Sequence, residues 1–178
     1  MRFLFLLIFF PFNIFSQDHI PINPNEYNDN NKKTGKWTIF YDKDWVETNK
    51  IKKAEFYRII NYENGIPKGK VFDYYLDGRM QWEGFLLSDD PEDIIDGECI
   101  FYSDYDYIKE NYNNGKLNGF KSIFDIQGNL LLKIEYNDGI QINHEVVKIP
   151  EDPKYKTYIE NWFYEIHYYY DSLGNYES

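Results

Sequence analysis

A short motif occurs three times in the chain and constrains its fold more than any other feature. It reads YENGIPKG at residues 62–69, YNNGKLNG at 112–119 and YNDGIQIN at 136–143. An Asn-Gly or Asp-Gly pair suits the centre of a type I′ hairpin turn, where both residues need positive φ. The motif therefore predicts a tight β-hairpin turn in each copy. The turn glycines are Gly65, Gly115 and Gly139.

Four segments that begin with glycine share a second pattern, an aromatic residue five positions after that glycine. β-Branched and aromatic residues fill these segments, which is typical of strands. A starting glycine allows a bulge or a close backbone approach where the strand begins. A polar turn then leads to a second strand, and Gly78 and Gly128 lie in two of these turns. The starting glycines are Gly35, Gly69, Gly97 and Gly119, and the aromatic residues are Phe40, Tyr74, Tyr102 and Phe124.

One unit of the chain is therefore a strand, a turn, a second strand and an Asn-Gly turn. The starting glycines lie 34, 28 and 22 residues apart, and we expect the extra residues, at 43–53 and 88–95, to form insertion loops. A single hairpin is not stable alone, so neighbouring hairpins must pack together. The predicted fold class is all-β. It is a meandering antiparallel single-layer sheet of four or five tandem hairpins over residues 35–143, with aromatic rings stacked between neighbouring hairpins.

With these residues the chain resembles the MORN-repeat-variant family, whose repeats run tyrosine, a polar residue, asparagine-glycine, lysine, a small residue and glycine. Residues 112–119 match this form, 62–69 match it less closely, and 136–139 match it in part. Asn143 stands where the last copy would have glycine, and we expect the terminal units to be caps. The resemblance covers residues 35–143. It implies an extended antiparallel sheet that binds other proteins, and bacterial relatives are often labelled antitoxin-like.

The first residues, MRFLFLLIFFPFNIFSQ, have the pattern of an export signal. One basic residue, Arg2, precedes an apolar run that ends at Phe12, and this run is too short to span a bilayer. We predict a signal peptide over residues 1–16, an exported periplasmic or extracellular protein, and no membrane span after cleavage. An uncleaved anchor is the alternative. Residues 17–34 contain two prolines and many asparagines, so we expect a polar lead-in that buries little.

The charge balance narrows the range of partners. The chain has 30 acidic and 19 basic residues, which gives a formal net charge of -11. Phosphate backbones and anionic bilayers attract basic surfaces, so neither nucleic acid nor an anionic membrane is an expected partner. An acidic protein instead favours a protein partner with a basic surface.

Residues for catalysis or cofactor binding form no recognised pattern in the sequence. The three histidines, His19, His144 and His167, have no metal-binding spacing, and no nucleophile elbow or phosphate-binding loop is present. Cys99, the only cysteine, lies in an apolar strand, where we expect it to be buried. We therefore predict no catalytic residues, no cofactor, no metal site and no enzymatic activity.

Two acidic stretches allow more than one interpretation. Residues 88–93, SDDPED, place four carboxylates in six positions. A solvated loop is the simpler interpretation, and calcium binding by the stretch from Asp89 to Asp93 is the alternative. Residues 102–107, YSDYDY, are expected to form a polar hairpin tip. Paired carboxylates for glycan hydrolysis would need a cleft, which a single sheet rarely supplies.

Aromatic residues make up 20% of the chain, and they allow two roles. The rings can fill the space between hairpins, or some can form an exposed platform for a protein or a glycan. The function we predict is an exported, non-enzymatic interaction module that binds another protein, with an antitoxin-like or immunity role by resemblance. An envelope structural module or a carbohydrate-binding module is the alternative, and a glycan-active hydrolase is the third.

Residues 144–178 form a C-terminal segment that two periodicities describe. A period of 3.6 residues would place Trp162 and Ile166 on one face of a helix with Tyr155 and Tyr158. Alternation from Trp162 would instead give a strand that ends in the turn sequence DSLGN. We expect a linker followed by a strand from about Trp162, with a short helix as the alternative.

Overall fold

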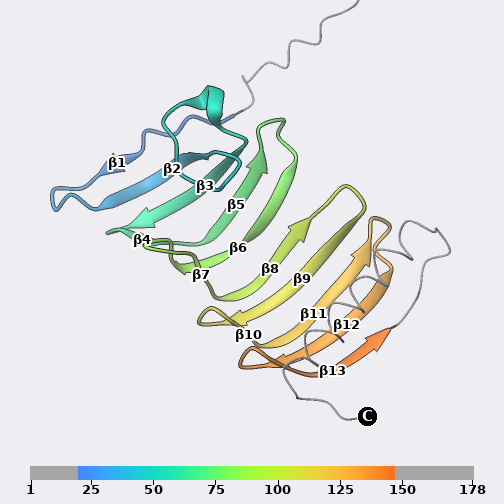
Figure 1. Cartoon of the computed structure of the whole chain (residues 1–178). Coiled ribbons are helices and arrows are strands. Elements are labelled where there is room, and N and C mark those ends of the chain that lie inside the picture. Colours follow the sequence, from blue (N-terminus) through green and yellow to red (C-terminus); the bar gives the residue numbers. More distant parts are fainter. Residues whose placement is uncertain (1–19, 147–178) are drawn as a thin grey trace, which may run out of the picture.

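The computed structural model describes residues 20–146, and these form one open antiparallel sheet of 13 strands. The strands lie side by side in meandering order (Figure 1), which confirms the predicted all-β single-layer fold. No α-helix occurs within the described range, and one 3₁₀ turn, Ile51–Lys53, lies in the first insertion. The predicted signal peptide and residues 147–178 lie outside the described residues.

Ten strands follow the main path of the sheet, and three two-residue strands pair beside it. The strands of the main path are β1 (Glu26–Tyr27), β2 (Lys33–Tyr41), β3 (Phe56–Glu63), β5 (Lys70–Tyr75), β6 (Met80–Ser88), β8 (Gly97–Tyr102), β9 (Asp106–Asn113), β11 (Gly119–Asp125), β12 (Leu130–Asn137) and β13 (Ile140–Val146). The short strands are β4 (Ile66–Pro67), which pairs with β3, β7 (Ile94–Ile95), which pairs with β6, and β10 (Lys116–Leu117), which pairs with β9.

The Asn-Gly turns have the backbone that a type I′ turn requires. Both central residues of each turn have positive φ, from 49° at Asn114 to 83° at Gly139. The amide of each turn glycine also donates a 2.8 Å hydrogen bond to the carbonyl two residues before the starting glycine of its own unit, where the preceding unit ends. Each turn therefore reverses the chain and ties two successive hairpins together. The bonded pairs are Gly65 with Lys33, Gly115 with Ile95, and Gly139 with Leu117.

The tyrosine that leads each motif lies opposite a glycine of the neighbouring strand. Tyr112 of β9 pairs with Gly97 of β8, and Gly119 of β11 pairs with Tyr136 of β12. The middle motif therefore supplies the tyrosine for one pair and the glycine for the next. This cross-strand partnership explains why tyrosine and glycine recur at this spacing. Tyr62 and Gly35 form the corresponding pair between β3 and β2.

The remaining predicted glycines also lie where the chain reverses or a strand begins. Gly78 and Gly128 have φ of 88° and 86°, and each donates a 2.9 Å hydrogen bond within the turn between two paired strands. The starting glycines Gly69, Gly97 and Gly119 have φ between 77° and 98°. Gly35, the first starting glycine, has a φ of 68°, so all nine glycines that the sequence singled out have a backbone that other residues adopt only at a cost.

Gly115→Val is expected to lower the melting midpoint by several degrees. Valine at φ +80° is strained by about 1–3 kcal/mol, and its Cβ would lie 3.5 Å from Ile94 Cγ2. Thermal unfolding followed by circular dichroism measures the effect. Asn114→Gly, which permits the same φ, is the control and should leave the midpoint close to that of the wild type. An unchanged midpoint for Gly115→Val would show that the turn does not need a glycine.

The strand register divides the side chains between two faces of the sheet. We call them the core face and the ladder face. On the core face, one cross-strand row consists of Ile39, Arg58, Asp73, Trp82, Phe101, Ile108, Ile123 and Leu132. On the ladder face, the neighbouring row consists of Thr38, Ile59, Phe72, Glu83, Ile100, Lys109, Ser122, Lys133 and Glu145.

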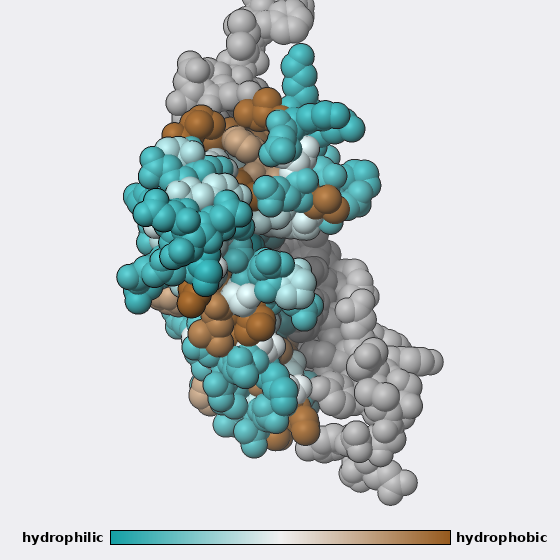
Figure 2. All heavy atoms as spheres, turned by 90° about the vertical axis from the view of Figure 1, so that its left-hand side faces the viewer, coloured by the Kyte–Doolittle hydropathy of each residue, from teal (hydrophilic) through white to brown (hydrophobic). Residues whose placement is uncertain are grey.

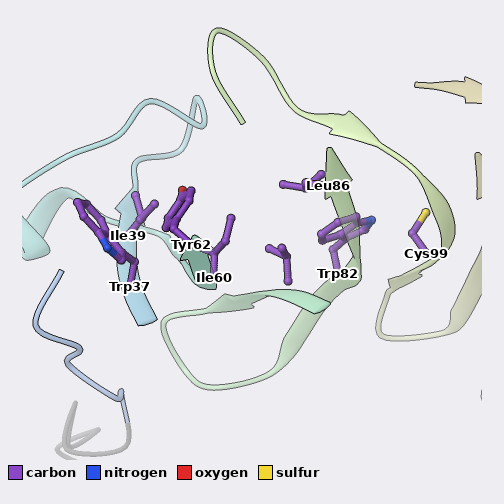
Figure 3. Packing of buried hydrophobic residues seen from close by; sticks show 8 residues of the cluster. Trp37, Ile39, Ile60, Tyr62, Trp82, Leu86 and Cys99 are labelled. Carbon is purple, nitrogen blue, oxygen red and sulfur yellow. The ribbon is translucent and has the colours of Figure 1, made fainter. Parts of the chain in front are cut away.

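The first core cluster lies on the core face of the N-terminal half of the sheet. Figure 3 shows Trp37 and Cys99 at its two ends, with Ile60, Tyr62 and Trp82 between them. Gly84 allows this packing, because a Cβ at that position would lie 2.5 Å from Trp82 Cζ2. The sequence did not indicate this role, since Gly84 begins no strand and lies in no turn. The cluster's buried members are Trp37, Ile39, Ile60, Tyr62, Val71, Trp82, Leu86 and Cys99.

The described part of the lead-in is mostly exposed and buries only Ile20, but it is hydrogen-bonded to the border of the sheet. Ile20 is buried, and β2 begins at Lys33, before the expected Gly35. The side-chain amide of Asn25 donates to the Thr38 carbonyl and accepts from the Thr38 amide, both at 2.8 Å. The Asn25 side chain thus replaces a neighbouring strand at this position. The Thr38 hydroxyl also donates to the Pro21 carbonyl.

Candidate functional site

The acidic stretch 88–93 is only in part the solvated loop that the sequence suggested, because residues 90–93 are exposed but two of its carboxylates bind the sheet. Asp89 accepts a hydrogen bond from the Tyr62 hydroxyl and lies 3.4 Å from Lys33 Nζ, and its side chain is only 7% exposed. Asp93 pairs with Arg58 through two bonds of 2.7 and 2.8 Å. The expected loop is therefore a strap across the core face. Two of its four carboxylates, those of Asp89 and Asp93, are held by partners from β2 and β3.

Arg58 is the centre of a buried charge cluster on the core face. Its guanidinium donates to both oxygens of Asp73, at 2.8 and 2.9 Å, as well as to Asp93. Burial raises the pKa of the Asp73 carboxyl, and the hydrogen bonds from Arg58 act in the opposite direction. Every strong interaction of this cluster is internal. We therefore regard it as part of the fold and not as a ligand site.

A calcium site in the stretch from Asp89 to Asp93 gains no support from this geometry. Asp89 and Asp93 already have hydroxyl or cationic partners that a metal ion would have to replace. Within residues 20–146, no group of three or more His, Cys, Asp or Glu side chains is placed to hold a metal ion. Calcium favours several carboxylate oxygens together, and Lys33 and Arg58 occupy that space instead.

The other candidate residues also have structural partners. At the tip between β8 and β9, Asp104 pairs with Arg79 at 2.5 Å, while Asp106 is buried and bonded to the Ser103 hydroxyl at 2.5 Å. Cys99 is buried as predicted, and burial raises the pKa of its thiol to about 12. A thiol with such a pKa is a poor nucleophile at neutral pH. His144 lies exposed on β13, whereas His19 and His167 lie outside the described residues.

A row of aromatic rings crosses the ladder face, and we call it the aromatic ladder. Its cross-strand contacts include Tyr57 with Tyr74, whose centroids are 5.0 Å apart, and Tyr107 with Phe124, at 4.9 Å. Of the predicted aromatic residues, Tyr74 and Phe124 stack on a partner, whereas Phe40 and Tyr102 make tilted contacts. The partners lie on return strands that the sequence pattern did not single out. The aromatic ladder consists of Phe40, Tyr57, Tyr74, Tyr102, Tyr107 and Phe124.

The ring orientation limits what the aromatic ladder can bind. The planes of Tyr57 and Tyr74 are 15° apart, and those of Tyr107 and Phe124 are 7° apart. Parallel rings at the strand spacing cover one another's faces and turn their edges outward. A sugar stacks on an exposed ring face, which these four residues do not offer. The half-buried edges of Tyr74, Tyr107 and Phe124 suit contact with protein groups better, whereas Tyr57 is buried. Burial and the nearby Glu83 carboxylate raise the pKa of Tyr102 to about 12, so its hydroxyl remains a donor.

Beside the aromatic ladder, the ladder face carries exposed rings and lysine side chains. Phe85 and Phe120 are 44% and 47% exposed. The Lys133 ammonium lies 3.6 Å from the centroid of Phe120, and Lys109 lies over Phe124 at 5.9 Å. These long side chains can cover or uncover the rings with little backbone movement.

The charges on the ladder face balance, although the chain is acidic overall. Register places five lysines and six glutamates on this face of the strands, so its net charge is close to zero. Exposed acids instead occur in turns, such as Asp77 and Asp138. Figure 2 views the side with the Asn-Gly turns, where hydrophilic side chains dominate and apolar ones form separate patches. The face's charged residues are Lys36, Lys70, Lys109, Lys116, Lys133, Glu26, Glu63, Glu83, Glu98, Glu135 and Glu145.

Two further findings bear on the candidate site. No helix within residues 20–146 is long and apolar enough to cross a membrane. In comparisons with known proteins, neither a protein-family model nor a curated protein matches the chain.

Proposed function

We propose that this protein is an exported, non-enzymatic interaction module that binds another protein through the ladder face. The observation that carries the proposal is the pair of exposed rings, Phe85 and Phe120, on a strand surface with balanced charge. Protein interfaces combine exposed aromatic anchors with a rim of both charges. Export rests on the pattern of residues 1–16 alone.

The dimensions of the ladder face suit such a partner. The nine strands from β2 to β13 on the main path span about 38 Å at the usual strand spacing. Three side-chain rows on that width give roughly 700 Å², comparable with the ~800 Å² that each partner contributes to a standard interface. The basic partner expected from the net charge would meet the acidic turns, which can speed its approach.

The proposal is tested with a double variant, Phe85→Ser with Phe120→Ser. Affinity capture from an extract of the producing cell's envelope should recover a co-purifying protein with the wild type, and at least tenfold less with the double variant. Ile126→Ser changes a side chain of similar exposure in a turn, and this control should retain capture. Equal recovery by the double variant and the control would show that the ladder face is not the binding surface.

Two alternatives predict different measurements. A structural module would self-associate with rising concentration in the absence of any other ligand, which sedimentation detects. A carbohydrate-binding module would bind glycans in a way that depends on the rings of the ladder face, and the covered faces of Tyr57, Tyr74, Tyr107 and Phe124 argue against it. The immunity-like role and membership of the MORN-repeat-variant family rest on the sequence resemblance, which the Tyr-Gly cross-strand pairs support.

A further inference from the structure

A second core cluster lies on the core face of the C-terminal half of the sheet. Its members are between 0% and 2% exposed, and Ile134 is fully buried. They come from the adjacent strands β11 and β12. The cluster consists of Ile123, Leu131, Leu132 and Ile134.

A single-layer sheet cannot bury its own face to this extent. Side chains on a sheet stand roughly perpendicular to it, so neighbours in the sheet shield their flanks and not their tips. The half-buried residues that pack on the second cluster, Ile108 and Tyr136, lie on the same sheet. The first cluster is different, because the strap with Asp89 and Asp93 crosses above it. The second cluster therefore needs a cover that does not come from the sheet.

The chain outside the described residues supplies a segment of suitable length and place. Strand β13 ends at Val146, which pairs with Leu132 of the cluster, so the chain leaves the sheet beside the surface that needs covering. The 32 residues of 147–178 follow. Trp162 and Ile166 belong to the apolar set of this segment under both a helical and a strand periodicity.

We propose that residues 147–178 fold back over the core face of β11, β12 and β13 and place Trp162 and Ile166 against the second core cluster. This arrangement covers the core face at both ends of the sheet, by the strap in one half and by the C-terminal segment in the other. The ladder face is then the face of the sheet that meets partners. The inference concerns the core face, so it stands or falls independently of the proposed binding.

Trp162 provides the test in the full-length mature chain. Subtracting the fluorescence spectrum of Trp162→Phe from that of the wild type isolates the emission of Trp162. We expect this emission to be blue-shifted, and acrylamide to quench it several-fold less than free tryptophan. Ile166→Asp, a change that leaves the sheet residues intact, should shift the emission to the red and restore quenching. Trp45→Phe is the control, because Trp45 is 38% exposed and its isolated emission should not respond to Ile166→Asp.

The outcomes separate the possible covers. Protection of Trp162 that is constant with concentration, in a chain that sediments as a monomer, supports docking of the segment on its own sheet. Protection that grows with concentration would mean that a second copy supplies the cover, and it would overturn the proposal. Quenching of Trp162 equal to that of free tryptophan would also overturn it. Because the wild-type measurement carries the decision, misfolding of Ile166→Asp would not leave the question open.

Discussion

Arg58→Leu is expected to lower the free energy of unfolding by about 3–5 kcal/mol, the usual cost of removing one partner of a buried ion pair. Asp73 is 3% exposed and receives two hydrogen bonds from Arg58. Without the guanidinium, the Asp73 carboxylate is buried without a counter-charge. Asp93 also loses its partner, so one of the attachments of the strap is lost. Urea unfolding at pH 7 measures the loss.

The loss of unfolding free energy in Arg58→Leu should be smaller at lower pH. Burial raises the pKa of Asp73, and in Arg58→Leu no guanidinium opposes that shift. A carboxyl whose folded pKa lies above its unfolded pKa stabilises the fold when protonated, and that contribution is lost as pH rises through the folded pKa. Unfolding at pH 5 should therefore show a smaller deficit than at pH 7. A deficit that grew toward low pH would contradict this account.

Two further variants make the Arg58 result specific. Lys116→Gln removes a pair with Asp138 whose side chains are 59% and 68% exposed, and it should cost at most about 1 kcal/mol. Adding Asp73→Leu to Arg58→Leu removes the stranded charge and should recover part of the stability. If Arg58→Leu cost no more than Lys116→Gln, the buried cluster would not be contributing to stability.

Gly84→Ala is expected to destabilise the fold by about 3 kcal/mol, at the upper end of the usual cost of overpacking. The new Cβ would lie 2.5 Å from Trp82 Cζ2 and 2.7 Å from Cys99 Cβ. Both neighbours are buried, so neither can move without disturbing the first core cluster. Thermal unfolding and the near-UV circular dichroism of the tryptophans should both report the change.

A double variant tests whether the clash with Trp82 causes the destabilisation in Gly84→Ala. Trp82→Leu in the Gly84→Ala background removes the closest clashing atoms, so the two changes should cost less together than the sum of their separate effects. Glu98→Ala, on the exposed face of a neighbouring strand, is the control and should stay within about 0.5 kcal/mol of the wild type. Simple additivity of Gly84→Ala and Trp82→Leu would show that the clash is not the cause.

The turns and the fold class could be predicted because their causes are local. Positive φ at Asn114 and Gly115 is a property of two adjacent residues, and β-branched and aromatic residues mark the strands between turns. The aromatic ladder was predictable in part for the same reason, since the five-residue spacing after each starting glycine places rings in one row. Its interleaved members, Tyr57 and Tyr107, lie on return strands with no such marker.

The strap and Gly84 could not be predicted because their causes are distant in sequence. Asp89 bonds a tyrosine 27 residues away, and Asp93 bonds Arg58, 35 residues away. The four carboxylates of residues 88–93 suggest a solvated loop, because the sequence gives no sign of these distant partners. Position 84 needs a glycine because the side chains of Trp82 and Cys99 occupy the space that a Cβ would take. This requirement arises from packing between hairpins.

The side-chain amide of Asn25 at the border of β2 has a consequence for polymerisation. Sheets of stacked hairpins can template their own lengthening when a border strand offers unpaired backbone groups. Here the Thr38 amide and carbonyl are occupied by Asn25, and the Phe40 carbonyl accepts from the Thr48 amide. An incoming strand must first displace the residues that precede β2 in the sequence. We therefore expect the residues around Asn25 to oppose fibril nucleation at this border, and a truncation beyond Asn25 should shorten the lag time of aggregation.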